Sequence, residues 1–122
     1  MPFIKIKKRY AMQKSESLGQ LSLALSKVQS KLNTNFTSYD DKELELKQIW
    51  DAVRDLLATN ELAIFQMPVD TGGVTTVISH SSGEYLQSTC YVPCEENEAS
   101  VRNAVSAARV MGIVSFLGIP FE

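Results

Sequence analysis

The 122-residue sequence has few of the side chains on which metal sites and many enzymes depend. It contains a single histidine, His80, and two cysteines, Cys90 and Cys94, which do not form a C-x-x-C pair. This composition makes a zinc site a weak hypothesis and favours free, reduced thiols. His80 lies at the end of an expected strand, where a polar residue beside a turn is a simpler interpretation than a catalytic base.

Long apolar runs are also missing. The C-terminal stretch is interrupted by Arg109, Gly112 and Gly118, so no run reaches the ~20 residues of a membrane span. The basic N-terminus is not followed by the apolar region of a signal peptide. We therefore expect a cytoplasmic protein. With 44% hydrophobic residues and only 4 prolines, the chain has the composition of a folded domain.

Motifs for bond-making chemistry are absent from the sequence. There is no phosphate-binding loop, no nucleophile–base pair and no spaced set of carboxylates for two metal ions. We therefore expect no enzyme activity and no cofactor. A metal- or nucleotide-dependent enzyme is the weakest of the hypotheses.

The net charge of -2 hides a strong asymmetry. Residues 1–14 form a basic arm with no acidic residue, whereas residues 15–122, expected to form a single domain, carry a net charge of -7. Such an arm is either a solubilising tail or an electrostatic contact for a polyanion, and charge alone favours neither. The basic residues of the arm are Lys5, Lys7, Lys8, Arg9 and Lys14.

Hydrophobic spacing predicts two amphipathic helices in the first half of the chain. The first is expected to begin at Ser15 and Glu16, which suit a helix N-terminus. The second is expected from about Glu43, with Asn60 as a left-handed cap at its end. The apolar stripes of the two helices are Leu18, Leu21, Leu25, Val28 and Leu32, and then Leu46, Ile49, Trp50, Val53, Leu56 and Leu57.

From Leu62 onward, the spacing of the hydrophobic residues changes from that of a helix to that of strands. Leu62–Val69, Val74–His80 and Glu84–Val92 are separated by glycine-bearing turns, which indicate a three-stranded antiparallel meander. In the third strand, alternation places Leu86 and Cys90 on one face. The other face carries tyrosines that could stack nucleic-acid bases, although solvated tyrosines on a sheet are common.

Val101–Ile119 predicts a long last helix packed on the sheet, which completes an α+β fold. Its core face is expected to contain Val101, Ala104, Val105, Ala108, Met111 and Ser115. Arg102, Ser106 and Arg109 fall on one stripe, and arginine keeps its charge, so we expect this stripe to face solvent. Spacing alone does not decide what the two arginines bind. Phosphates and the carboxylates of Asp51, Asp55 or Glu98 are equally suitable partners.

The order of these segments resembles the ERF (essential recombination function) family of phage-type single-strand annealing proteins. The stretches "WDAVRDLLATNELAIFQMPVDTGGVTTVISHSSGEYLQSTCYVP" and "NAVSAARVMGIVSFLGI" carry the resemblance, which covers residues 14 to 119. It implies a β-β-β-α core that assembles side by side into rings or filaments. Single-stranded DNA would run along a groove lined by basic residues, and complementary strands would pair without ATP. Such a recombinase acts in DNA recombination and repair and is not an enzyme in the chemical sense.

The leading hypothesis is therefore an oligomeric annealing protein that binds single-stranded DNA through its phosphates with little sequence preference. Family-style protein partners are a single-strand binding protein or an exonuclease, in the host cytoplasm if the protein is phage-encoded. The expected DNA contacts, in order, are Arg109, Arg102, Lys5, Lys7, Lys8, Arg9, Arg54 and Lys47.

Two departures from the family pattern motivate an alternative. Where the family carries a Tyr-Ala-Arg-Arg-Tyr-like run, this chain has Ala107–Met111, with Arg109 as its one arginine. The segment "FTSYDDKE" keeps Phe36, Ser38 and Tyr39 of a Phe-Lys-Ser-Lys-Tyr-like segment but lacks its lysines. The alternative is an oligomeric interaction module that keeps the annealing fold and has weakened or lost DNA binding.

Overall fold

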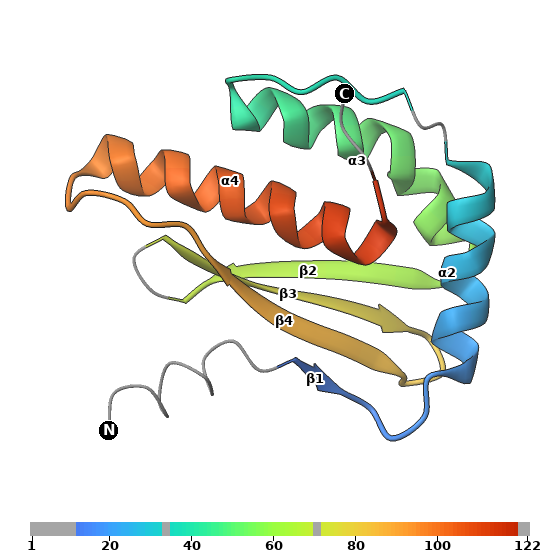
Figure 1. Ribbon diagram of the computed structural model, residues 1–122. Coiled ribbons are helices and arrows are strands. Elements are labelled where there is room, and N and C mark those ends of the chain that lie inside the picture. The colour runs from blue at the N-terminus through green and yellow to red at the C-terminus, as the bar shows by residue number, and fades with distance from the viewer. Residues whose placement is uncertain (1–11, 33–34, 70–71, 120–122) are drawn as a thin grey trace.

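The computed structural model describes residues 12–32, 35–69 and 72–119, which form a layer of helices on one face of an antiparallel sheet (Figure 1). Helices α3 and α4 run side by side above the sheet, and α2 closes one end (Figure 1). The helices are α2 (Gly19–Lys31), α3 (Lys42–Thr59) and α4 (Glu98–Leu117). The strands are β1 (Gln13–Lys14), β2 (Leu62–Pro68), β3 (Gly73–His80) and β4 (Tyr85–Tyr91). The expected α+β class is confirmed.

The sheet has one strand more than the expected three-stranded meander, because its order is β1-β4-β3-β2. Gln13 pairs with Gln87, and Lys14 pairs with Leu86. A strand of two residues has no hydrophobic alternation by which the sequence could reveal it. The end of the expected arm therefore belongs to the sheet edge. Its other four cations, Lys5, Lys7, Lys8 and Arg9, lie outside the described residues.

Strands β2, β3 and β4 follow one another as the sequence predicted. Leu62 lies opposite His80 in the first pair, and Gly73 lies opposite Tyr91 in the second. The turn between β3 and β4 places Gly83 at a φ of 96°, in the left-handed region that favours glycine. Nδ1 of His80 accepts a hydrogen bond from the backbone N–H of Ser82 at 3.1 Å, so this histidine ends β3 and stabilises the turn beside it, as its position indicated.

Helix α2 begins at Gly19, later than the expected start at Ser15 and Glu16. The preceding residue provides no side-chain cap. The helix is capped instead from the β3–β4 turn: Oε1 of Glu84 accepts a hydrogen bond from the backbone N–H of Leu21 at 2.7 Å. A cap supplied from so far along the chain leaves no local signature, which explains the error.

Helix α3 begins at Lys42, one residue before the prediction, with Asp41 as its side-chain cap. The helix ends at Thr59 with Asn60 as its C-cap, as predicted, but the left-handed conformation expected of this cap was wrong. Asn60 has a φ of -101°, and the residue with positive φ is Glu61, at 60°. Four residues of the predicted stripe are buried in the core, with Ile49 and Val53 fully enclosed, and Trp50 and Leu56 are partly buried against it.

Helix α4 has two buried faces, whereas its hydrophobic spacing predicted one. Gly112 lies against Thr76 of β3, and the small residues Ala104 and Ala108 precede it at helical spacing. A second stripe packs toward α3 and consists of Ser106, Val110, Ile113 and Leu117. Met111 and Ser115, both expected in the core, are exposed, because small residues rather than bulky ones face the sheet.

Among the described residues, no helix combines the length and the apolar character needed to cross a bilayer.

Candidate functional site

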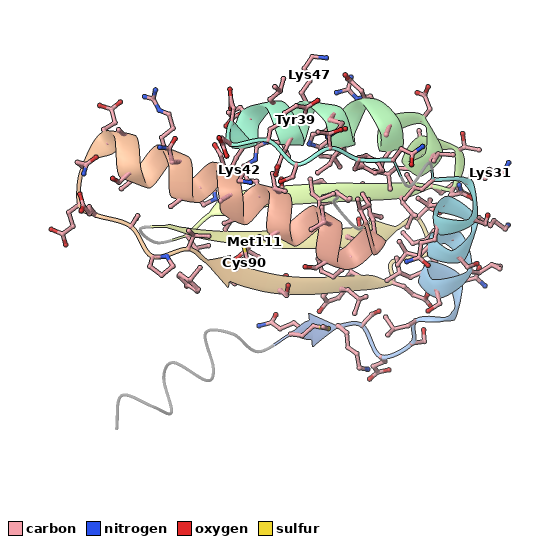
Figure 2. The ribbon with its side chains drawn as sticks, turned by 45° about the horizontal axis from the view of Figure 1, so that its top comes forward. Lys31, Tyr39, Lys42, Lys47, Cys90 and Met111 are labelled. Atoms are coloured by element: carbon pink, nitrogen blue, oxygen red, sulfur yellow. The ribbon has the colours of Figure 1, made fainter. Side chains whose placement is uncertain are left out.

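The cations expected to bind DNA are distributed over separate parts of the molecule. Arg102 lies near the start of α4, and Arg109 lies further along the same helix, beside β2. Lys47 and Arg54 lie on the exposed side of α3, and Lys47 points away from the ribbon in Figure 2. Their contacts therefore place these four side chains at separate positions rather than at one shared site.

Two of the four cations are already paired with carboxylates. Nη2 of Arg102 lies 2.7 Å from Oε1 of Glu98, and Nζ of Lys47 lies 2.6 Å from Oδ2 of Asp51. Both pairs join successive turns of one helix at the surface, where an ion pair is worth at most about 0.5 kcal/mol. Arg54 is exposed and makes no ion pair with any described residue. Arg102 is therefore paired with a carboxylate, which is one of the two kinds of partner that its spacing allowed.

Arg109 is half-buried at the junction of α4 with the edge strand β2. Its Nε donates to Oε1 of Gln66 at 3.4 Å, while Nε2 of Gln66 donates to the carbonyl oxygen of Arg109 at 2.8 Å. The same Nε2 lies 3.1 Å from Oγ1 of Thr76. Gln66 therefore ties the backbone and the side chain of Arg109 to the sheet and restricts the reach of the guanidinium.

The expected solvent-facing stripe of Arg102, Ser106 and Arg109 does not exist. Ser106 is buried, and its hydroxyl donates a hydrogen bond to Oε1 of Glu43 on α3. The prediction failed because α3 covers this side of α4 after its first turns. Arg102 escapes burial because it precedes the covered part.

A groove with a volume of about 850 Å³ lies between the start of α3, the segment after β4 and the first half of α4. Its side chains include the carboxylates of Asp40, Asp41, Glu43 and Glu95, against the single lysine Lys42. This excess of negative charge repels phosphate. The resemblance implied a groove lined by basic residues, and this groove has the opposite charge.

A buried carboxylate fixes the linker that leads into this groove. Glu45 is 2% exposed, and its Oε2 accepts hydrogen bonds from the backbone N–H of Tyr39, from Ser38 Oγ at 2.9 Å and from Lys42 Nζ at 3.1 Å. Tyr39 and Lys42 are neighbours at this end of α3 (Figure 2). Burial raises the pKa of Glu45, but the hydrogen bonds and the charge of Lys42 outweigh it, so the pKa lies below its ordinary value.

The two cysteines are free and lie in different surroundings. Cys90 faces the helices from β4, and burial raises the pKa of its thiol. Cys94 lines the acidic groove. In the described ranges, no three His, Cys, Asp or Glu side chains come close enough together to hold a metal ion.

Comparison of the chain with protein-family models, with curated proteins and with solved structures found no match.

The sheet face turned away from the helices is a further surface of functional interest (Figure 1). We define the open face by the outward residues Ala63, Phe65, Met67, Thr75, Val77, Ser79, Tyr85, Gln87, Thr89 and Tyr91. Phe65 is 58% exposed and Met67 is 66% exposed. The sequence identified the tyrosine-bearing side of β4, but Phe65 and Met67 occur in an apolar run whose two faces cannot be told apart without the fold.

Proposed function

We propose that this chain is a single-strand annealing protein that binds single-stranded DNA through its phosphates and promotes pairing of complementary strands without ATP, as an oligomer. The observation that carries the proposal is the β2–β3–β4–α4 unit, in which a long helix lies across one face of an antiparallel meander. This order is the one that the resemblance to the ERF family implies.

The charge distribution supports a main role of the N-terminal arm in the proposed DNA binding. Within the described residues, Arg102 and Lys47 are paired with carboxylates, and the groove between α3 and α4 is acidic. The arm carries basic residues without a single acid, and it leaves the described structure at β1, on the edge of the sheet. In the proposed function, Lys5, Lys7, Lys8 and Arg9 contact phosphates first, while Arg109 and Arg54 add to them from the folded domain.

Binding of full-length protein to a labelled single-stranded oligonucleotide, measured from about 50 to about 300 mM NaCl, tests this proposal. Each neutralised phosphate on a single strand contributes about 0.7 to the slope of log K against log salt. The double variant Lys7→Gln, Lys8→Gln is therefore expected to lower the slope by about 1.4. The matched control is Lys27→Gln, Lys31→Gln, which removes the same charge from the exposed side of α2.

Equal losses in the two double variants would show that only net charge matters and would contradict a specific role of the arm. A complete lack of binding at low salt would favour the second candidate, an interaction module with the annealing fold. The acidic groove and the pairing of Arg102 with Glu98 are the observations that favour this candidate. It predicts a stable oligomer that does not bind oligonucleotides.

A further inference from the structure

The open face has the composition of a protein–protein interface. Strands β2, β3 and β4 contain no Asp, Glu, Lys or Arg, so no fixed charge lies on it from these strands. Interface cores are depleted of charged residues and enriched in aromatic residues and methionine. The residues of these types on the open face are Phe65, Met67, Tyr85 and Tyr91.

The cross-strand pairs of this face make it continuous across three strands. Phe65, Val77 and Gln87 lie side by side across three strands. The hydroxyls of Thr75 and Thr89 are joined by a 2.8 Å hydrogen bond, which leaves each threonine methyl group available to a neighbour. The ring of Tyr91 lies over Gly73, where a Cβ would collide with it. A continuous sheet face without charged side chains suits the packing of a second sheet.

The size of the face is sufficient for a specific contact. With strands about 4.8 Å apart and a rise of about 3.3 Å per residue, three seven-residue strands cover about 15 Å by about 23 Å. Two such faces in contact bury on the order of 1,000 Å² of accessible surface, at the lower limit of stable interfaces.

Charge favours a second copy of this chain over a nucleic acid as the occupant. Phosphate binding depends on Lys and Arg, and the strands of this face provide neither. The carboxylates of Asp41, Glu43, Asp51 and Asp55 all lie on α3 or at its start, on the opposite side of the sheet. Two copies in contact through their sheets therefore keep these acidic helices apart, which minimises their mutual repulsion.

We propose that the open face is a self-association surface, on which the sheets of two copies pack against each other around a two-fold axis. Such an interface is isologous, because each copy presents the same patch. This inference does not depend on DNA binding. It differs from side-by-side assembly through strand edges, which would leave the open face exposed to solvent.

Native mass spectrometry and light scattering of the full-length chain test this proposal, with Met67→Glu and Gln87→Glu as variants. The wild type is expected to be a dimer or a multiple of dimers. Each variant places two like charges in the interface and is expected to raise the dissociation constant at least about tenfold. Gln87→Glu changes no volume and lies away from the β2 edge, so it separates face packing from edge pairing.

Leu23→Glu is the matched control, because Leu23 is a 54% exposed apolar residue on α2, outside the open face. It is expected to leave the mass unchanged, and thermal unfolding verifies that all variants fold. A wild type that stays monomeric up to about 100 μM would overturn the proposal. The proposal would also be overturned if Leu23→Glu dissociated the assembly as much as Met67→Glu and Gln87→Glu do. Loss of oligonucleotide binding by Met67→Glu at unchanged mass would instead assign the face to nucleic acid.

Discussion

Gly112 on α4 lies directly against the side chain of Thr76 on β3. A Cβ on Gly112 would collide with Oγ1 of Thr76 and would lie 3.4 Å from Nε2 of Gln66. Because Thr76 and Gln66 are hydrogen-bonded to each other, neither side chain moves aside freely. The absence of a side chain at this position allows α4 to approach the sheet closely enough for Gln66 to reach the backbone of Arg109.

We predict that Gly112→Ala lowers the free energy of unfolding by about 1 to 3 kcal/mol, the usual effect of overpacking a core. Urea denaturation measures this change. Gly19→Ala is the control, since a Cβ at Gly19 meets no heavy atom within 4 Å, and it is expected to be neutral or stabilising. Equal stability of Gly112→Ala and the wild type would contradict the close packing of α4 on β3.

Glu45 should make stability depend on pH. Its pKa in the folded protein lies below the ordinary value of 4.5, so its contribution is present in full above that value and is lost as pH falls through the folded pKa. Glu45→Gln is expected to cost about 1 to 3 kcal/mol near pH 7 and to flatten the stability profile below pH 5. Asp55→Asn, an exposed carboxylate on the same helix, is the control and should change little. A Glu45→Gln profile parallel to the wild type would refute this role of the carboxylate.

Arg109 and Arg102 should differ in their effect on stability, although the sequence placed them on one stripe. Arg102→Ala removes an exposed pair with Glu98 and is expected to cost at most about 0.5 kcal/mol. Arg109→Ala removes the hydrogen bond to Gln66 and buried contacts of the side-chain stem, for about 1 kcal/mol. Chemical denaturation measures the free energy of unfolding of both variants and shows whether the two losses differ. The same small change in each would mean that Gln66 does not hold Arg109 in solution.

The three longer strands and two of the helices could be predicted from the sequence because their signals are local. Val74–His80 is rich in β-branched residues and ends at a turn, and the stripe from Leu46 to Leu57 repeats at helical spacing. The bounds of the three strands and the start of α3 lie within one residue of the predicted ones, whereas α4 begins three residues before and ends two residues before the predicted range Val101–Ile119. Strand β1 escaped prediction because its two residues pair with β4 through the backbone alone.

The candidate site was harder to predict, because its decisive contacts join distant segments. Glu43 and Ser106 meet only when α3 packs on α4, and neither residue carries a local sign of burial. The role of Gln66 could not be predicted either. In the sequence it is an ordinary polar residue in an apolar strand, and only the fold brings Arg109 beside it. The sign of the charge, in contrast, could be predicted from composition. Residues 15–122 contain an excess of acidic residues, and several of them line the acidic groove.

Annealing itself is the most direct measure of the proposed function. Two complementary labelled oligonucleotides are mixed with the full-length chain at low salt without any nucleotide, and the rate of duplex formation is followed by fluorescence transfer. We predict an increase over the rate without protein, which is reduced in Lys7→Gln, Lys8→Gln and retained in Lys27→Gln, Lys31→Gln. A rate that does not differ from that of the oligonucleotides alone would contradict the proposed function.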